Sequence, residues 1–187
     1  MNAQQMLNLR LMFDSYLDGQ GNNDFKCIQT TIYNKVKTLG KKFSFCIDSA
    51  QVPKDGNAAY KAGLGIIYYK FEEGIPVITP FRHEFFHGFQ DAFYTGGTAQ
   101  YNTGTRTGFP NLEFEQALFY DILEGSGSAT AMGSTADISI TDEYRTWISS
   151  ITNNNTKYPK QFKSIKNFAI SDLIKTKSTA YITLILA

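Results

Sequence analysis

The chain has almost no net charge and no long apolar run. Its 18 lysines and arginines nearly balance 17 aspartates and glutamates, which leaves a formal net charge of +1. Nucleic acids and anionic membranes are bound through basic surfaces, so this balance argues against both as partners. No stretch of about 18 apolar residues is present, so we expect no transmembrane helix.

The first residues lack the pattern of a secretory leader. The segment MNAQQMLNLRLMFDSYLDG has no basic start followed by an uninterrupted apolar stretch. We therefore expect no signal peptide. The cytoplasm is then the default compartment, and secretion is the alternative if a leader has been removed.

Cysteine is scarce, and the two that occur are far apart. Cys27 and Cys46 form neither a CxxC motif nor a metal-ligand spacing. They can pair in one disulfide or remain as two buried thiols. Their apolar neighbours favour buried thiols.

The composition is that of a soluble globular chain. Apolar residues make up 42% of the 187 residues and aromatic residues 14%, which is enough for a sizeable core. We find no internal repeat and no long linker, so we expect one domain over residues 1–187. Periodicity and turn residues predict an α+β fold, in which two helices precede a small mixed sheet and further helices follow it.

The expected elements follow from apolar spacing and from start and stop signals. We expect Thr79 to cap the helix over residues 79–94 with Pro80 at its first helical position, and Asn111 to cap a helix that ends near Gly125. Residues 49–59 and 95–110 are expected to be loops. Helices are expected over 6–16, 25–39, 79–94, 112–124, 141–151 and 159–175, and strands within 41–48, 63–71 and 74–79.

Both histidines of the chain lie in the stretch RHEFFHGFQD, four residues apart. On a helix this spacing places His83 and His87 on one face, where two imidazoles can hold one metal ion. Glu84 is rotated by about 100° from His83. It is therefore placed to act as a general base on the ion-bound water and not as a third ligand. HExxH at the start of a helix predicts a Zn²⁺ site.

A catalytic zinc ion usually has three protein ligands, and no third histidine exists. Asp91 lies one turn further along the helix, where it suits a hydrogen bond to His87 better than a metal bond. Glu115 is the preferred third ligand, because a carboxylate in an apolar stripe needs a partner such as a metal. Glu113 is the alternative, on a face expected to be more polar. The stripe around Glu115 consists of Leu112, Leu118, Phe119 and Ile122.

The motifs HEFFH and NLEFEQA together resemble the gluzincin pattern of zinc metallopeptidases, over about 45 residues from Thr79 to Leu123. The ExE pair is similar to that of small ImmA/IrrE-like bacterial peptidases, where the second glutamate binds zinc. The resemblance implies a zincin-like fold with Glu115 as a ligand. Two departures are present: Phe119 stands where thermolysin-like enzymes have an aspartate, and no distant histidine remains for the oxyanion.

These observations predict a zinc-dependent metalloendopeptidase that acts on a peptide or protein substrate. We expect Tyr144 to donate a hydrogen bond to the oxyanion, with Tyr101, Arg106 and Arg145 as alternatives. An extended substrate can add as a strand beside residues 63–71 or 74–79. The alternatives are a zinc-binding sensor or partner-binding module without catalysis, and a toxin or self-processing domain of a larger protein.

Overall fold

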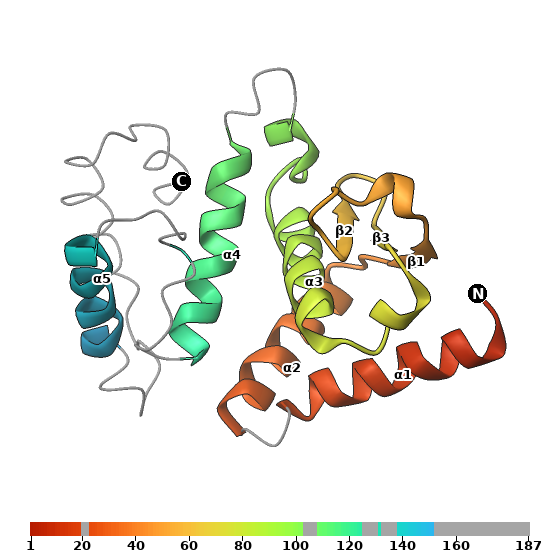
Figure 1. The fold of residues 1–187 in the computed structure, drawn as a ribbon, viewed down its shortest axis with the longest axis horizontal. Helices are drawn as coiled ribbons and strands as arrows, with labels where there is room; N and C mark the ends of the chain where they lie inside the picture. The colour runs from red at the N-terminus through yellow and green to blue at the C-terminus, as the bar shows by residue number, and fades with distance from the viewer. Residues whose placement is uncertain (20–22, 103–107, 125–130, 132–137, 152–187) are drawn as a thin grey trace. The chain divides into compact units, whose positions relative to one another are not determined.

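The computed structural model describes residues 1–19, 23–102, 108–124, 131 and 138–151. These residues form an α+β fold with five α-helices and a three-stranded mixed sheet (Figure 1). The α+β class and the small mixed sheet were predicted. The chain divides into two compact units, Met1–Gln100 and Tyr101–Ala187. The sheet lies in the first unit. A single zincin-like domain over residues 1–187 stays a prediction.

Two helices open the first unit, and both were predicted. Helix α1 spans Ala3–Leu17 and α2 spans Asn23–Thr38. Asn2 starts α1 through a capping box: its side chain accepts from the Gln5 amide at 2.8 Å, and Gln5 Oε1 accepts from the Asn2 amide at 2.7 Å. This exchange satisfies two backbone donors that a helix start leaves without partners.

The sheet has the order β1-β3-β2, with β3 in the centre. Strands β1 (Ser44–Ile47) and β3 (Ile66–Tyr69) were predicted, and they pair in parallel. Strand β2 (Ala58–Lys61) was missed, because its first residues were assigned to a loop. It pairs antiparallel with β3 across a short turn in which Gly63 and Gly65 have φ of 77° and 67°. Glycine adopts this left-handed conformation without steric cost.

The strand expected within residues 74–79 is absent from the described structure. A short 3-10 helix, η3 (Glu72–Gly74), precedes a turn at Ile75 and Pro76, and helix α3 then begins. Pro76 has no amide hydrogen and cannot contribute to a ladder. Ile75 is fully buried in this turn. A short apolar run that is buried in a turn has the same sequence pattern as a buried strand, which explains the wrong prediction.

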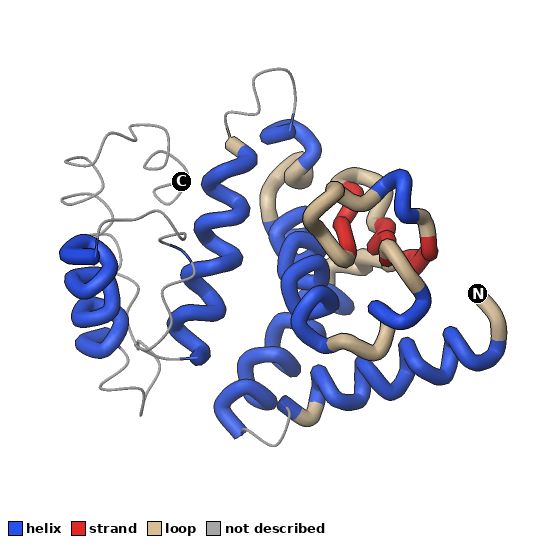
Figure 2. The backbone as a smooth tube through the Cα atoms, viewed as in Figure 1, coloured by secondary structure: helices blue, strands red, loops and turns tan. Residues whose placement is uncertain are grey.

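Helix α3 (Ile78–Phe93) is the centre of the first unit and packs against α1, α2 and β2 (Figure 1). Its phenylalanines supply the core. Phe81 and Phe85 stack with centroids 5.2 Å apart, and both contact Phe13 and Tyr16 of α1 edge to face. Each buried aromatic ring of this size contributes about 2–3 kcal/mol to folding. Figure 2 colours these helices and the small sheet by secondary structure.

The expected caps of two helices were wrong. Helix α3 begins at Ile78 after Val77, so Thr79 is its second residue and Pro80 is its third and not its first. Pro80 still lies in the first turn, where no amide hydrogen is needed. Helix α4 spans Phe109–Glu124, so Asn111 lies inside it and is buried. The Gly108 carbonyl accepts the first amides of α4, from Asn111 at 3.2 Å and from Leu112 at 3.4 Å.

The second unit contains α4 and α5 (Ile138–Ile151), and both helices were predicted. Leu118, Tyr144 and Ile148 form a buried cluster between them, with Phe114 and Trp147 packed against it. The helix expected over 159–175 lies outside the described residues. The remaining short helices are η2 (Ser49–Gln51) and η4 (Ala99–Asn102), and each lies in a segment that was expected to be a loop.

The two cysteines are free thiols, as favoured, but both are exposed. The expectation that they would be buried was wrong. Cys27 lies on an outer face of α2, and Cys46 lies on β1, where burial alternates along the strand. In the described part of the chain, no helix combines the length and apolarity needed to cross a bilayer.

Candidate metal centre

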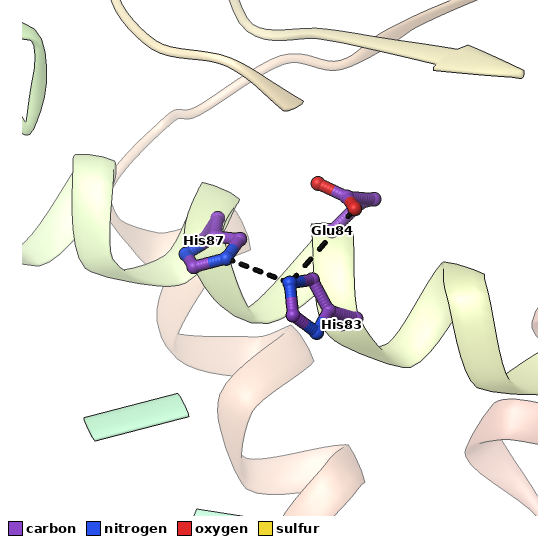
Figure 3. A group of neighbouring side chains, drawn as sticks. All are labelled: His83, Glu84 and His87. Carbon is purple, nitrogen blue, oxygen red and sulfur yellow. Dashed lines mark hydrogen bonds and ion pairs between the residues drawn. The ribbon is translucent and has the colours of Figure 1, made fainter. Parts of the chain in front are cut away.

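Helix α3 presents both histidines from neighbouring turns. His83 Nε2 and His87 Nε2 are 3.0 Å apart, and the ring centroids are separated by 4.7 Å. Two nitrogens bound to one tetrahedral zinc ion at ~2.0–2.1 Å lie about 3.4 Å from each other. The observed separation differs from this by a few tenths of an ångström, so the pair fits a chelate (Figure 3).

Glu84 completes a cluster of possible ligand atoms, all within 4.8 Å of one another. Its Oε1 lies 4.0 Å from His83 Nε2, and its side chain is largely buried. The carboxylate also accepts a 2.6 Å hydrogen bond at Oε2 from the main-chain amide of Tyr60 on β2. Dashed lines in Figure 3 join the His83 ring to Glu84 and to His87. A carboxylate is thus held beside the two imidazoles.

The second nitrogen of His87 is bound by Gln90 and not by Asp91. His87 Nδ1 lies 2.7 Å from Gln90 Oε1, and Gln90 is 1% exposed. With the amide oxygen as acceptor, Nδ1 carries the hydrogen and Nε2 presents its lone pair. A partner of this kind fixes the ring and tautomer of a metal-binding histidine. The expected hydrogen bond from His87 to the Asp91 carboxylate was therefore wrong.

Asp91 is instead the acceptor of a separate network. Its Oδ2 accepts from the Tyr60 hydroxyl at 2.7 Å, from the Gly63 amide at 3.3 Å and from Lys41. Its Oδ1 accepts from Thr98 through both the amide, at 2.7 Å, and the hydroxyl, at 3.0 Å. Burial alone would raise the pKa of Asp91, but the hydrogen bonds from Lys41, Thr98 and Tyr60 outweigh it. They lower the pKa from 3.8 to about 2.

The glutamates expected as third ligand lie on α4, in the second unit. Glu115 and Glu113 are both half-buried, so exposure does not separate them. The face assigned to Glu113 is less exposed than expected, because its neighbours Gln116 and Tyr120 are buried. Coordination by Glu115 stays a prediction.

Tyr144 lies in the core of the second unit and is 1% exposed. Its hydroxyl donates a 2.8 Å hydrogen bond to Asp121 Oδ2, and Asp121 also accepts from the Ala131 amide at 2.8 Å. Burial, followed by the charge and hydrogen bond of Asp121, raises the pKa of Tyr144. These contacts give the hydroxyl a structural role, and its hydrogen bond to an oxyanion stays a prediction.

The other candidate donors receive no added support. Arg106 lies outside the described residues, and Arg145 binds Asp142 Oδ1 at 3.2 Å. Tyr101 is half-buried beside Gly108.

The position expected for an extended substrate also changes. Strand β3 is central, so both of its edges are already paired. Residues 74–79 form no strand. A strand cannot be added at either expected place.

Sequence reasoning missed two residues that contact the centre. Gln90 is a polar residue three positions after His87 on a helix, and this spacing alone marks it as a neighbour of the ring. Tyr60 lies on the unrecognised strand β2, and no local signal connects it to α3. Comparisons of the chain with protein-family models, with curated proteins and with solved structures found no match in any of the three.

Proposed function

We propose that this protein is a zinc-dependent hydrolase, in particular a metalloendopeptidase. The observation that carries the proposal is the chelating geometry of His83 and His87, with the Glu84 carboxylate 4.0 Å from His83 Nε2. A zinc ion there would polarise a scissile carbonyl and lower the pKa of water to near neutrality. The same residue types at the same spacing carry the resemblance to gluzincins.

The roles of the chain's own residues follow from their chemistry. His83 and His87 hold the metal through Nε2, and Gln90 orients the His87 ring. Glu84 accepts a proton from the attacking water and passes it to the leaving amine, since a carboxylate can do both at neutral pH. Glu115 is proposed as the third ligand.

A zinc-binding module without catalysis is the second candidate. It is favoured by the 2.6 Å hydrogen bond between Glu84 and the Tyr60 amide, which gives Glu84 a structural reason to be present. The two candidates share the metal but differ in whether the Glu84 carboxylate is needed for a reaction.

Metal analysis and a peptidase assay on the same preparations distinguish these candidates. We expect about one zinc per chain, its loss in His87→Ala, and cleavage of unfolded casein or peptide libraries that a chelator abolishes. Glu84→Gln should retain zinc and lose cleavage, because an amide cannot accept the proton. Glu73→Gln, at an exposed position on η3, is the matched control and should change neither measurement.

The outcomes separate the metal site from the reaction. Full zinc content in His87→Ala would exclude the site itself. Bound zinc with no cleavage of any substrate would favour the non-catalytic module. Loss of zinc affinity in Glu115→Ala but not in Glu113→Ala would identify the third ligand, and equal losses would reject Glu115.

A further inference from the structure

One tyrosine contacts two acidic residues of α3 at once. Glu84 and Asp91 are seven residues apart, so they lie on the same helical face two turns from each other. The Tyr60 main-chain N–H donates to Glu84 Oε2 at 2.6 Å. The hydroxyl of the same residue donates to Asp91 Oδ2 at 2.7 Å. Tyr60 therefore spans the interval between the two carboxylates.

The Asp91 end of this span is a fixed anchor. Asp91 is 5% exposed and accepts hydrogen bonds from β2, from the β2–β3 turn, from Thr98 and from Lys41. Charge-assisted hydrogen bonds of this kind are about twice as strong as neutral ones. A carboxylate held by donors from several segments defines where the Tyr60 hydroxyl can lie.

The helix surface between the two carboxylates permits this close approach. Gly88 lies there, and a Cβ at this position would be 2.2 Å from the Phe43 ring. Phe43 packs beside Tyr60 with ring centroids 6.1 Å apart. The bare backbone at Gly88 thus allows Phe43, just before β1, and Tyr60, on β2, to lie against α3.

We propose that Tyr60 is a positioning residue for Glu84, an inference that rests on the proposed function. Asp91 anchors the Tyr60 side chain, and this contact keeps the Tyr60 amide on Glu84 Oε2. The carboxylate is then oriented with Oε1 toward His83, at 4.0 Å from Nε2. Oε1 is the oxygen that takes the proton. Tyr60 acts through Glu84 and does not touch the substrate in this role.

Two variants test the two ends of the contact. Tyr60→Phe removes the hydroxyl and retains the amide, whereas replacing Tyr60 by its α-hydroxy acid turns the amide into an ester and retains the hydroxyl. Both should lower kcat by about 10- to 100-fold, the cost of a catalytic group displaced by about 1 Å, with KM and zinc content unchanged. Tyr68→Phe is the matched control on β3, where a half-buried tyrosine should be replaceable without loss.

A second readout needs neither zinc nor a substrate. In the metal-free protein the amide proton of residue 60 should resonate far downfield because of its short bond to a carboxylate, and Glu84→Gln should move it upfield. Tyr60→Phe should move it in the same direction and speed its exchange with solvent. Tyr68→Phe should leave both unchanged.

The two readouts separate this inference from the function on which it rests. An unaltered kcat in both Tyr60 variants, in a protein that cleaves peptides, overturns the positioning role alone. A wild-type protein that cleaves nothing refutes the proposed function, and the amide proton then decides whether Asp91 and Tyr60 hold Glu84. An unshifted amide proton in Tyr60→Phe overturns the inference. If Tyr60→Phe does not fold, the ester variant provides the kinetic result.

Discussion

Removal of the Asp91 charge should destabilise the protein by an amount that depends on pH. The pKa of Asp91 is lowered from 3.8 to about 2. Each pKa unit corresponds to about 1.4 kcal/mol, so the ionised form contributes about 2 kcal/mol to folding at neutral pH. Asp91→Asn should lose that contribution, because an amide carries no charge to pair with Lys41.

The sign of the pH dependence follows from the direction of this shift. A carboxylate with a depressed pKa in the folded state stabilises the fold above the unfolded value of 3.8. That stability is lost as the pH falls through 3.8 toward about 2. The difference in the free energy of unfolding between wild type and Asp91→Asn should therefore be largest at pH 7 and should shrink steadily below about pH 4.

Urea unfolding followed by circular dichroism, at several pH values between 7 and 3, measures this difference. Asp55→Asn is the matched control, because Asp55 is exposed and a surface substitution should change stability by less than about 0.5 kcal/mol. The reasoning is refuted if Asp91→Asn is as stable as wild type at pH 7. It is also refuted if the difference does not change with pH.

Three further substitutions test packing and buried hydroxyls. Gly88→Ala should lower the free energy of unfolding by about 1–3 kcal/mol, because its methyl group would overlap the Phe43 ring. Phe43→Ala in the same chain should relieve the overlap. A Gly88→Ala variant as stable as wild type would contradict this prediction. Tyr69→Phe should leave stability unchanged or raise it by about 1 kcal/mol, since the buried Tyr69 hydroxyl has no hydrogen-bond partner among the described residues; a clear loss on thermal melting would show that the hydroxyl is used. Tyr144→Phe should destabilise by about 1–3 kcal/mol by leaving Asp121 with one donor fewer, and an unchanged melting temperature would count against that contact.

The local part of the fold could be predicted from the sequence. The helix spacing of His83 and His87 depends only on residues within two turns, and the ring nitrogens do converge. Helices α1, α2 and α5 were also found from apolar periodicity. The start of α4 was misplaced, because Asn111 is a good cap in isolation while a backbone carbonyl, that of Gly108, takes the role.

What depends on distant segments could not be predicted. Strand β2 begins with two alanines, which have weak strand preference, and it is a strand because β3 pairs with it. Helical periodicity places Asp91 on the same face of α3 as Glu84. It does not show which other segment of the chain packs on that face. Lys41, Tyr60 and Thr98 reach Asp91 from three other parts of the chain.

The topology of the sheet implies an order in which it assembles. Strands β2 and β3 are joined by a short turn and can form a hairpin early, within the microseconds typical of such local contacts. Strand β1 must pair in parallel with β3 across an intervening segment that contains β2 itself, as in Ser44 with Ile66. Closing that longer loop costs more chain entropy and is slower. We therefore expect β2 and β3 to pair before β1 is added to the sheet.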